Sequence, residues 1–263
     1  MPVLLGIDHV VLAVDDVDAS ANVLEERLGL AATGGGRHDA LGTFNRLIWL
    51  GDAFLELIGI FDEDLAAATW LGRPVLETLR RGGGLVTWAI AVDDLDDTLR
   101  WGPRNQGLVG PIDGERRRPD GEIVRWRVAR PDAPGPTTPF VIEHDLAAAE
   151  WTAADRAARA QQHHPFGGRA RVAGIEVSTG SPAVAAGRLR SLLAATAEPA
   201  GRGAVRLRLG DHEVRFVSPG PAWAATVDIV ADRPTRTRTV RVGDCHIRLR
   251  GSPASGHVDD LPR

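Results

Sequence analysis

Histidine and carboxylate side chains carry most of the chemistry open to this sequence. Its 263 residues include no lysine, no tyrosine and a single cysteine, Cys245. Schiff-base chemistry on lysine, acid–base chemistry on tyrosine and a thiolate zinc cluster are therefore excluded. Eight histidines and 35 acidic residues remain. General acid–base catalysis, with or without a metal, is the chemistry that these residue types support.

Glu56 has the most informative position among the carboxylates. It lies in the middle of an apolar strand candidate, Phe54-Leu55-Glu56-Leu57-Ile58. Alternate residues of a strand share one face, so Glu56 lies on the face of Phe54 and Ile58. A carboxylate in such a strand usually faces solvent, a partner cation or a metal. His9 lies in another apolar strand candidate and is the first imidazole to consider with it.

An internal repeat supplies the elements that position these residues. Residues 7–18 recur as residues 85–96, each copy an apolar strand followed by an Asp-rich helix start. Further strand candidates follow each copy, and Gly51-Asp52 is a good two-residue hairpin turn between two of them. Each unit therefore reads βαβββ. In the second unit Thr87 stands at the position of His9, and Glu143 is the carboxylate matched to Glu56.

Two fainter copies of the unit occupy the rest of the chain. We expect an N-terminal domain over residues 1–162, with modules at about 5–80 and 81–145 and an Ala-rich connector helix at 146–162. Residues 163–263 form a degenerate module pair. Its Glu positions hold Arg215 and Arg248 and its His positions hold Gly174 and Thr226, so this pair lacks the His and Glu of the first unit. The fold class is α+β, built from tandem βαβββ modules.

The modules resemble those of the vicinal oxygen chelate superfamily, which includes glyoxalases, bleomycin resistance proteins and dioxygenases. More narrowly, residues 5–180 resemble the glyoxalase-like domain proteins. The segments that carry the likeness are Asp8-His9-Val10-Val11, Gly34-Gly35-Gly36-Arg37-His38, Gly42-Thr43-Phe44-Asn45, Thr87-Trp88-Ala89, Val124-Arg125-Trp126-Arg127 and Pro139-Phe140-Val141-Ile142-Glu143.

This resemblance implies that the modules curl a mixed sheet into a cup, and that the cup holds a metal site. His9, Glu56 and Glu143 match ligand positions, and Thr87 departs from them because a hydroxyl is a poor ligand. The set would suit a divalent Zn, Mn, Fe or Ni ion. A lyase or isomerase reaction on a small carbonyl or hydroxy compound follows, with Glu143 as the base and Glu56 as its alternative. The expected substrate-binding residues are His38, Asn45, Arg125 and Trp126.

Several alternatives stay open at this stage. His9 is also compatible with a core histidine, and Glu56 and Glu143 with salt bridges to Arg125 or Arg127. Loss of the ligand at Thr87 favours a metal-free binding protein, of the kind that sequesters antibiotics. The basic run at residues 116–118 reads as solvated, but at the rim of the cup it would favour an anionic substrate.

Composition limits the partners and the location. The net charge is −4 and the sequence pI is about 6.1, so no basic field favours nucleic acid. No apolar run approaches the roughly 18 residues of a membrane span, and the N-terminus does not read as a signal peptide. We therefore expect a cytoplasmic monomer or homodimer that binds a small molecule.

Overall fold

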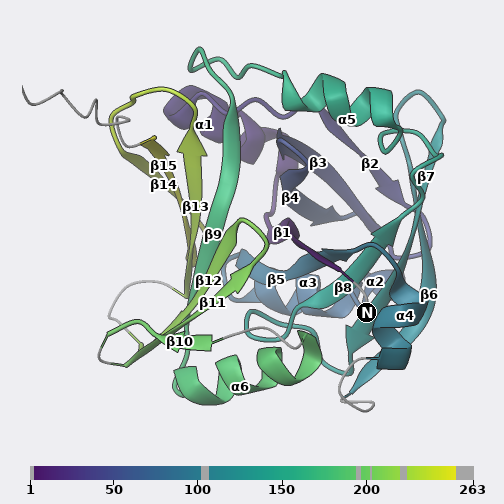
Figure 1. Cartoon of the computed structure of the whole chain (residues 1–263). Coiled ribbons are helices and arrows are strands. Elements are labelled where there is room, and N and C mark those ends of the chain that lie inside the picture. Colours follow the sequence, from purple (N-terminus) through teal and green to yellow (C-terminus); the bar gives the residue numbers. More distant parts are fainter. Residues whose placement is uncertain (1–2, 102–106, 194–196, 202, 220–223, 253–263) are drawn as a thin grey trace, which may run out of the picture.

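The first two modules close into an eight-stranded barrel. The computed structural model describes residues 3–101, 107–193, 197–201, 203–219 and 224–252, and Figure 1 shows the barrel beside a second sheet. The strand order around the barrel is β1-β4-β3-β2-β6-β7-β8-β5. The strands are β1 (Leu4–Ala13), β2 (Gly34–His38), β3 (Thr43–Leu50), β4 (Ala53–Ile60), β5 (Gly84–Val92), β6 (Leu108–Arg117), β7 (Ile123–Pro131) and β8 (Phe140–His144). The predicted curled α+β fold is confirmed, and its sheet curls to full closure.

The helices of this half begin where the Asp-rich segments predict. Asp16 caps α1, with its carboxylate accepting from the Ala19 amide at 2.9 Å, and Asp94 accepts from the Asp97 amide at 2.7 Å at the start of α4. Such side chains satisfy amides that have no partner in the first turn. The helices are α1 (Val17–Leu28), α2 (Glu63–Ala67), α3 (Gly72–Arg80), α4 (Leu95–Trp101) and α5 (Ala153–Ala160).

The connector helix is shorter than the Ala-rich composition predicts. A helix was expected over residues 146–162, but α5 begins only after Thr152, whose hydroxyl accepts from the Asp155 amide at 3.2 Å. Residues 145–152 form turns instead. A Thr side chain that caps a helix start competes with continued helix on its N-terminal side. The segment at 145–152 is consequently free to reach the barrel.

The last two modules form an open sheet with the pairing pattern of the barrel. The order is β10-β11-β12-β9-β13-β15-β14. Parallel pairs β9–β12 and β13–β15 flank the antiparallel pair β9–β13, as β1–β4 and β5–β8 flank β1–β5. The elements are β9 (Ala170–Ser178), α6 (Pro182–Leu193), β10 (Ala197–Pro199), β11 (Ala204–Leu209), β12 (His212–Val217), β13 (Ala225–Ala231), β14 (Arg238–Val242) and β15 (Cys245–Gly251).

The two halves share one hydrophobic core. Leu12 of β1 and Trp88 of β5 are fully buried in the same cluster as Ile229 of β13. Two turns of the second sheet also bond the barrel backbone. His212 Nδ1 accepts from the Ile7 amide at 3.1 Å, and Asp244 Oδ1 accepts from the Leu85 amide at 3.0 Å. The boundary expected near residue 163 thus separates two sheets that pack together. Residues 253–263 of the expected second half lie outside the described residues.

No helix among the described residues is long and apolar enough to cross a membrane.

Because the core is shared, we expect a cavity on the outer face of β1 to destabilise both sheets together. Leu12→Ala should lower the free energy of unfolding by about 2 to 5 kcal/mol, the usual cost of this truncation in a core. Hydrogen-exchange protection should fall in β13 as much as in β1. Val184→Ala is the control, since Val184 is 54% exposed. Loss of protection confined to the barrel strands would contradict a shared core.

Candidate functional site

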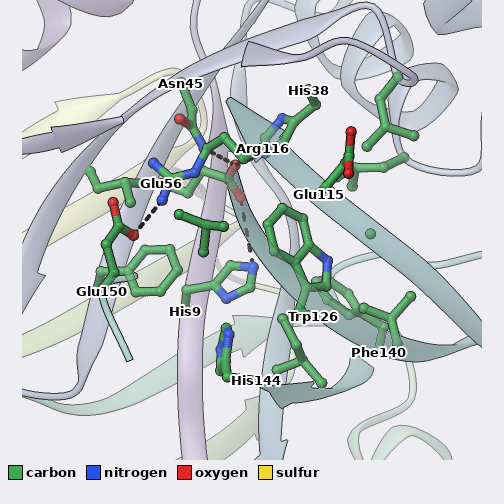
Figure 2. A pocket seen from close by; sticks show the side chains of 18 of the residues that line it. His9, His38, Asn45, Glu56, Glu115, Arg116, Trp126, Phe140, His144 and Glu150 are labelled. Carbon is green, nitrogen blue, oxygen red and sulfur yellow. Dashed lines mark hydrogen bonds and ion pairs between the residues drawn. The ribbon is translucent and has the colours of Figure 1, made fainter. Parts of the chain in front are cut away.

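A cavity of about 130 Å³ lies inside the barrel, between the walls of the two modules. Figure 2 shows polar and aromatic side chains around it. Five of its polar members come from separate strands and are each only 4% to 5% exposed: His9, His38, Asn45, Glu56 and Arg116. Its aromatic walls are Trp49, Phe54, Trp70, Trp126, Phe140 and Trp151. Charged and polar groups with so little water depend on one another for partners.

Strand β1 carries an extra residue at the edge of the cavity. Ile7 pairs with Ile90 and His9 pairs with Ala89, so Asp8 has no partner on β5. Such a bulge re-aims side chains next to it. Here Asp8 Oδ1 lies 2.5 Å from Nδ1 of the adjacent His9.

Asp8 joins His9 to a second imidazole, that of His144. Its Oδ2 lies 2.8 Å from Nε2 of His144, while Oδ1 faces His9. Burial by itself would raise the pKa of Asp8, but the His144 and His9 imidazoles outweigh it and hold that pKa well below its usual range. The ionised carboxylate accepts only. It therefore fixes a hydrogen on Nδ1 of His9 and turns Nε2 toward the cavity.

Glu56 occupies the centre of the polar group, on β4. Asn45 donates from Nδ2 to Oε1 at 2.6 Å. His9 Nε2 lies 3.7 Å from Oε2, and His38 Nε2 lies 3.9 Å from Oε1. The alternation that places Glu56 with Phe54 is as the sequence predicts, and the alternative of a salt bridge from Glu56 to Arg125 or Arg127 is not found. Glu56 is a buried carboxylate beside two imidazoles.

His38 is held on the opposite side of Glu56 from β1. Its Nδ1 lies 3.0 Å from the Thr43 hydroxyl, and its ring meets Trp126 edge to face with centroids 5.8 Å apart. Burial lowers the pKa of His38 to about 4, with the Glu56 carboxylate opposing this shift and the Arg116 guanidinium adding to it. The imidazole is therefore neutral near pH 7, and one of its nitrogens carries a hydrogen.

Arg116 and Glu150 are members of the site that the sequence pattern misses. Arg116 on β6 is 4% exposed and forms an ion pair with Glu150. Its neighbour Arg117 points outward, with 53% of its side chain exposed. The basic run was expected to be solvated, and alternation along β6 corrects this for Arg116. Nothing in the sequence around Glu150 marks it, because it lies in the turns before α5.

Glu143 lies outside the cavity, which corrects the predicted ligand set and the predicted base. Its carboxylate accepts from Arg127 at 2.6 Å and from the Leu95 amide at 3.3 Å. Phe140, Ile142 and His144 line the cavity from β8. Residues of even number face inward on this strand, so an odd position cannot join them. Glu143 is a surface ion-pair residue, the alternative that the sequence had left open.

Arg125 also lies away from the cavity, so its predicted role in binding substrate is corrected. Its side chain is 62% exposed and pairs with Glu115 at 3.7 Å. It alternates with Val124 and Trp126, which both line the cavity. Of the four predicted substrate-binding residues, the structure thus brings His38, Asn45 and Trp126 together with His9 and Glu56.

The residues present do not fit the predicted divalent metal. The carboxylate expected from the second module is missing from the cavity, because Ile142 faces it where Glu143 was expected. The Nε2 atom of His144, which also lines the cavity, is already engaged by Asp8 at 2.8 Å. Thr87 is buried outside it, with Oγ1 3.5 Å from the Thr138 carbonyl oxygen. Across the described part of the chain, no group of three or more His, Cys, Asp or Glu side chains is arranged to hold an ion. A guanidinium in the same cavity further disfavours a cation.

Known structures share this architecture. A hypothetical protein from Staphylococcus aureus is 16% identical, covers 94% of this chain and 99% of its own, and has a TM-score of 0.77. A xylose isomerase-like TIM barrel/4-hydroxyphenylpyruvate dioxygenase fusion protein is 16% identical, covers 97% of this chain and 50% of its own, with a TM-score of 0.54. These two likenesses concern the fold.

A smaller part of the chain matches methylmalonyl-CoA epimerase from Mycobacterium tuberculosis. That structure is 28% identical, covers 56% of this chain and 94% of its own, and has a TM-score of 0.42. A search of curated proteins gave no significant match.

The family model described as a glyoxalase-like domain matches residues 7–193, which is most of the chain. The match includes β1 with its bulge, all eight barrel strands, and β9 with α6. The protein therefore belongs to the glyoxalase-like domain family.

Proposed function

We propose that the protein is an enzyme that moves a proton on a small carbonyl or hydroxy compound bound in the barrel cavity. Glu56 is the general base. The observation that carries this proposal is the surroundings of the buried Glu56 carboxylate. Asn45 donates to its Oε1, the Nε2 atom of His9 lies 3.7 Å from Oε2, and the Nε2 atom of His38 lies 3.9 Å from Oε1. Positioned groups of this kind supply general acid–base catalysis.

Each polar residue has a distinct part in the proposed step. Glu56 removes the proton from the carbon next to the carbonyl, and the electron pair of that bond moves into the enolate. The neutral His38, with Nδ1 accepting from Thr43, donates from Nε2 to the developing oxygen charge, as neutral imidazoles do at enolates. His9, held by Asp8, accepts the proton from Glu56 at Nε2 and returns it.

The proposal assigns no step to a metal, since Glu143, the ligand expected from the second module, lies outside the cavity and pairs with Arg127. It differs in this from the Lewis-acid reaction that the family resemblance implies. The reaction type stays within isomerisation, epimerisation or lysis, because each begins with the same proton removal. The choice among them depends on the leaving group of the substrate.

A second candidate is a metal-free binding protein without turnover. The observation that favours it is the aromatic lining, where Trp49 lies against Phe54 with ring centroids 4.7 Å apart and Trp151 stacks on His144 at 3.5 Å. Aromatic walls bind apolar ligand surface effectively. Binding of a carbonyl compound without any exchange of its protons would favour this candidate.

The test of the enzymatic proposal is proton exchange in D₂O. We would incubate the protein with a panel of small 2-oxo and 2-hydroxy acids, diketones and their esters, and follow loss of C–H signals by proton NMR. Glu56→Gln should slow exchange by about 10² to 10⁴-fold, the usual contribution of a general base. Its matched control is Glu143→Gln, a carboxylate on the outer face, which should keep exchange within about twofold. Equal loss in both variants, or no exchange in the wild type, would reject Glu56 as the base.

The buried His38 makes folding sensitive to acid. The pKa of His38 falls from 6.5 in the unfolded chain to about 4 in the folded protein. Between these two pH values the unfolded chain binds a proton at His38 and the folded protein does not. The stability from a neutral His38 is complete above pH 6.5 and is lost as the pH falls toward 4.

His38→Gln should therefore flatten the dependence of stability on pH. Between about pH 7.5 and about pH 5, the wild type should lose about 2 kcal/mol more unfolding free energy than the variant. Urea unfolding at each pH measures the difference. His163→Gln, which changes an exposed imidazole, should keep the wild-type slope. The same slope in the His38 variant would show that this imidazole is not buried in its neutral form.

A further inference from the structure

We propose that Arg116 binds a carboxylate group of the substrate, at the place that the Glu150 carboxylate occupies in this structure. The substrate is then a small carboxylic acid that also carries the reacting carbonyl or hydroxy group. This inference rests on the proposed function in one respect, that the barrel cavity is the substrate site. The Arg116 guanidinium has unused hydrogen-bonding capacity that such a group would fill.

Arg116 is buried but only partly satisfied. Its Nη2 donates to Oε2 of Glu150, while Nη1 is enclosed without a hydrogen-bond partner among the described residues. A guanidinium presents five donors, and two parallel bonds to one carboxylate are its preferred arrangement. A buried donor without a partner is costly. A ligand carboxylate that engages both terminal nitrogens removes this cost, which Glu150 does not do.

The backbone of Glu150 is strained and is held by a neighbouring side chain. It has a φ of +70°, and no other non-glycine residue in the described ranges has a positive φ. Arg159 donates to its carbonyl oxygen and lies over the Trp49 and Trp151 rings, 4.2 and 4.9 Å from their centroids. Residues with such backbone angles persist where the surrounding contacts impose the conformation, often at ligand-binding sites. Trp49 and Trp151, on which Arg159 lies, line the cavity.

Glu150 has a second cationic partner when it leaves Arg116. Its Oε1 already lies 3.6 Å from Nε of Arg118, whose side chain is 29% exposed, against 4% for Arg116. A shift toward Arg118 moves the carboxylate toward solvent without leaving it unpaired. The substrate carboxylate then replaces one buried negative charge with another, so the charge balance around Glu56 is unchanged. Figure 2 shows the Arg116–Glu150 pair beside Glu56.

The cavity size restricts the rest of the acid. About 130 Å³ is slightly less than an apolar cavity of about 150 Å³ that holds benzene. Trp126 and Phe140 give the non-polar part of such a molecule its walls. We therefore expect an acid of about six or seven non-hydrogen atoms, rather than a conjugate of a large carrier group.

The test uses two probes of the same shape, 2-oxobutanoate and the neutral 2,3-pentanedione. Calorimetry or quenching of tryptophan fluorescence measures the binding of each. The wild type should bind 2-oxobutanoate more tightly. Arg116→Met should weaken the binding of 2-oxobutanoate by about 10- to 100-fold, the usual range for loss of a charged hydrogen bond. The affinity for 2,3-pentanedione should stay within about threefold of the wild-type value.

Glu150→Gln guards against misfolding of the Arg116 variant. It keeps the shape of the side chain but removes the competing charge, so 2-oxobutanoate should bind about tenfold more tightly and 2,3-pentanedione should not change. Weaker 2-oxobutanoate binding in this variant, equal binding of both probes by the wild type, or no binding of 2-oxobutanoate would each overturn the inference.

These outcomes are separate from those of the proposed function. Binding of 2-oxobutanoate that depends on Arg116 without proton exchange would sustain the inference and reject Glu56 as a base. Proton exchange on 2-oxobutanoate that depends on Glu56, with binding of 2-oxobutanoate that Arg116→Met leaves unchanged, would sustain the proposed function and reject the inference.

Discussion

The whole arrangement depends on β1, which bonds β4 and β5 in the barrel and supports the second sheet on its outer face. Its apolar residues therefore alternate between two cores, Val11 inside the barrel and Leu12 between the sheets. A strand that is buried on both faces has no face on which a charged side chain can reach solvent. The extra residue at Asp8, one of three register shifts between β1 and β5, breaks the alternation beside the cavity. It thereby brings a carboxylate and an imidazole to the same side of one strand.

Removal of water then determines what each charged group does. Asp8 is 2% exposed, and burial of an isolated carboxylate raises its pKa and favours the protonated form. It stays ionised because His9 and His144 both face it. Glu56 instead receives a neutral amide from Asn45 and stands at 3.7 Å from His9. One carboxylate is committed to holding imidazoles and the other keeps an oxygen toward the cavity, a division of roles between two acids that acid–base enzymes use.

Much of the fold and part of the site are readable from the sequence. The repeat predicts the modules, and alternation around Phe54 predicts the inward face of Glu56. The same alternation applied to Phe140 predicts Ile142 and His144 on the inner face of β8, and excludes Glu143. The prediction for Glu143 was wrong because it matched a Glu in the second module to Glu56 by residue type. The position along β8 decides which side chains face the cavity, and Glu143 is at an outward-facing position. Asp8 could not be found in this way, because a bulge overrides the alternation that a pattern assumes. Glu150 lies in turns, where no periodicity exists.

The second sheet shows why closure is needed for a site. Its strands keep the barrel's register, with Arg215 beside Glu176 and Arg248 beside Asp228 at the positions that Glu56 and its neighbour on β1 occupy. There the pairs are direct ion pairs at 2.9 and 2.6 Å on side chains 21% to 40% exposed. Solvent near an open sheet screens such charges, so they contribute little beyond solubility and modest stability. In the barrel, the facing module excludes water from the same positions. The desolvated carboxylate and imidazoles can then act on a bound molecule, which makes the fold's closure the step that turns a repeated structural position into a reactive one.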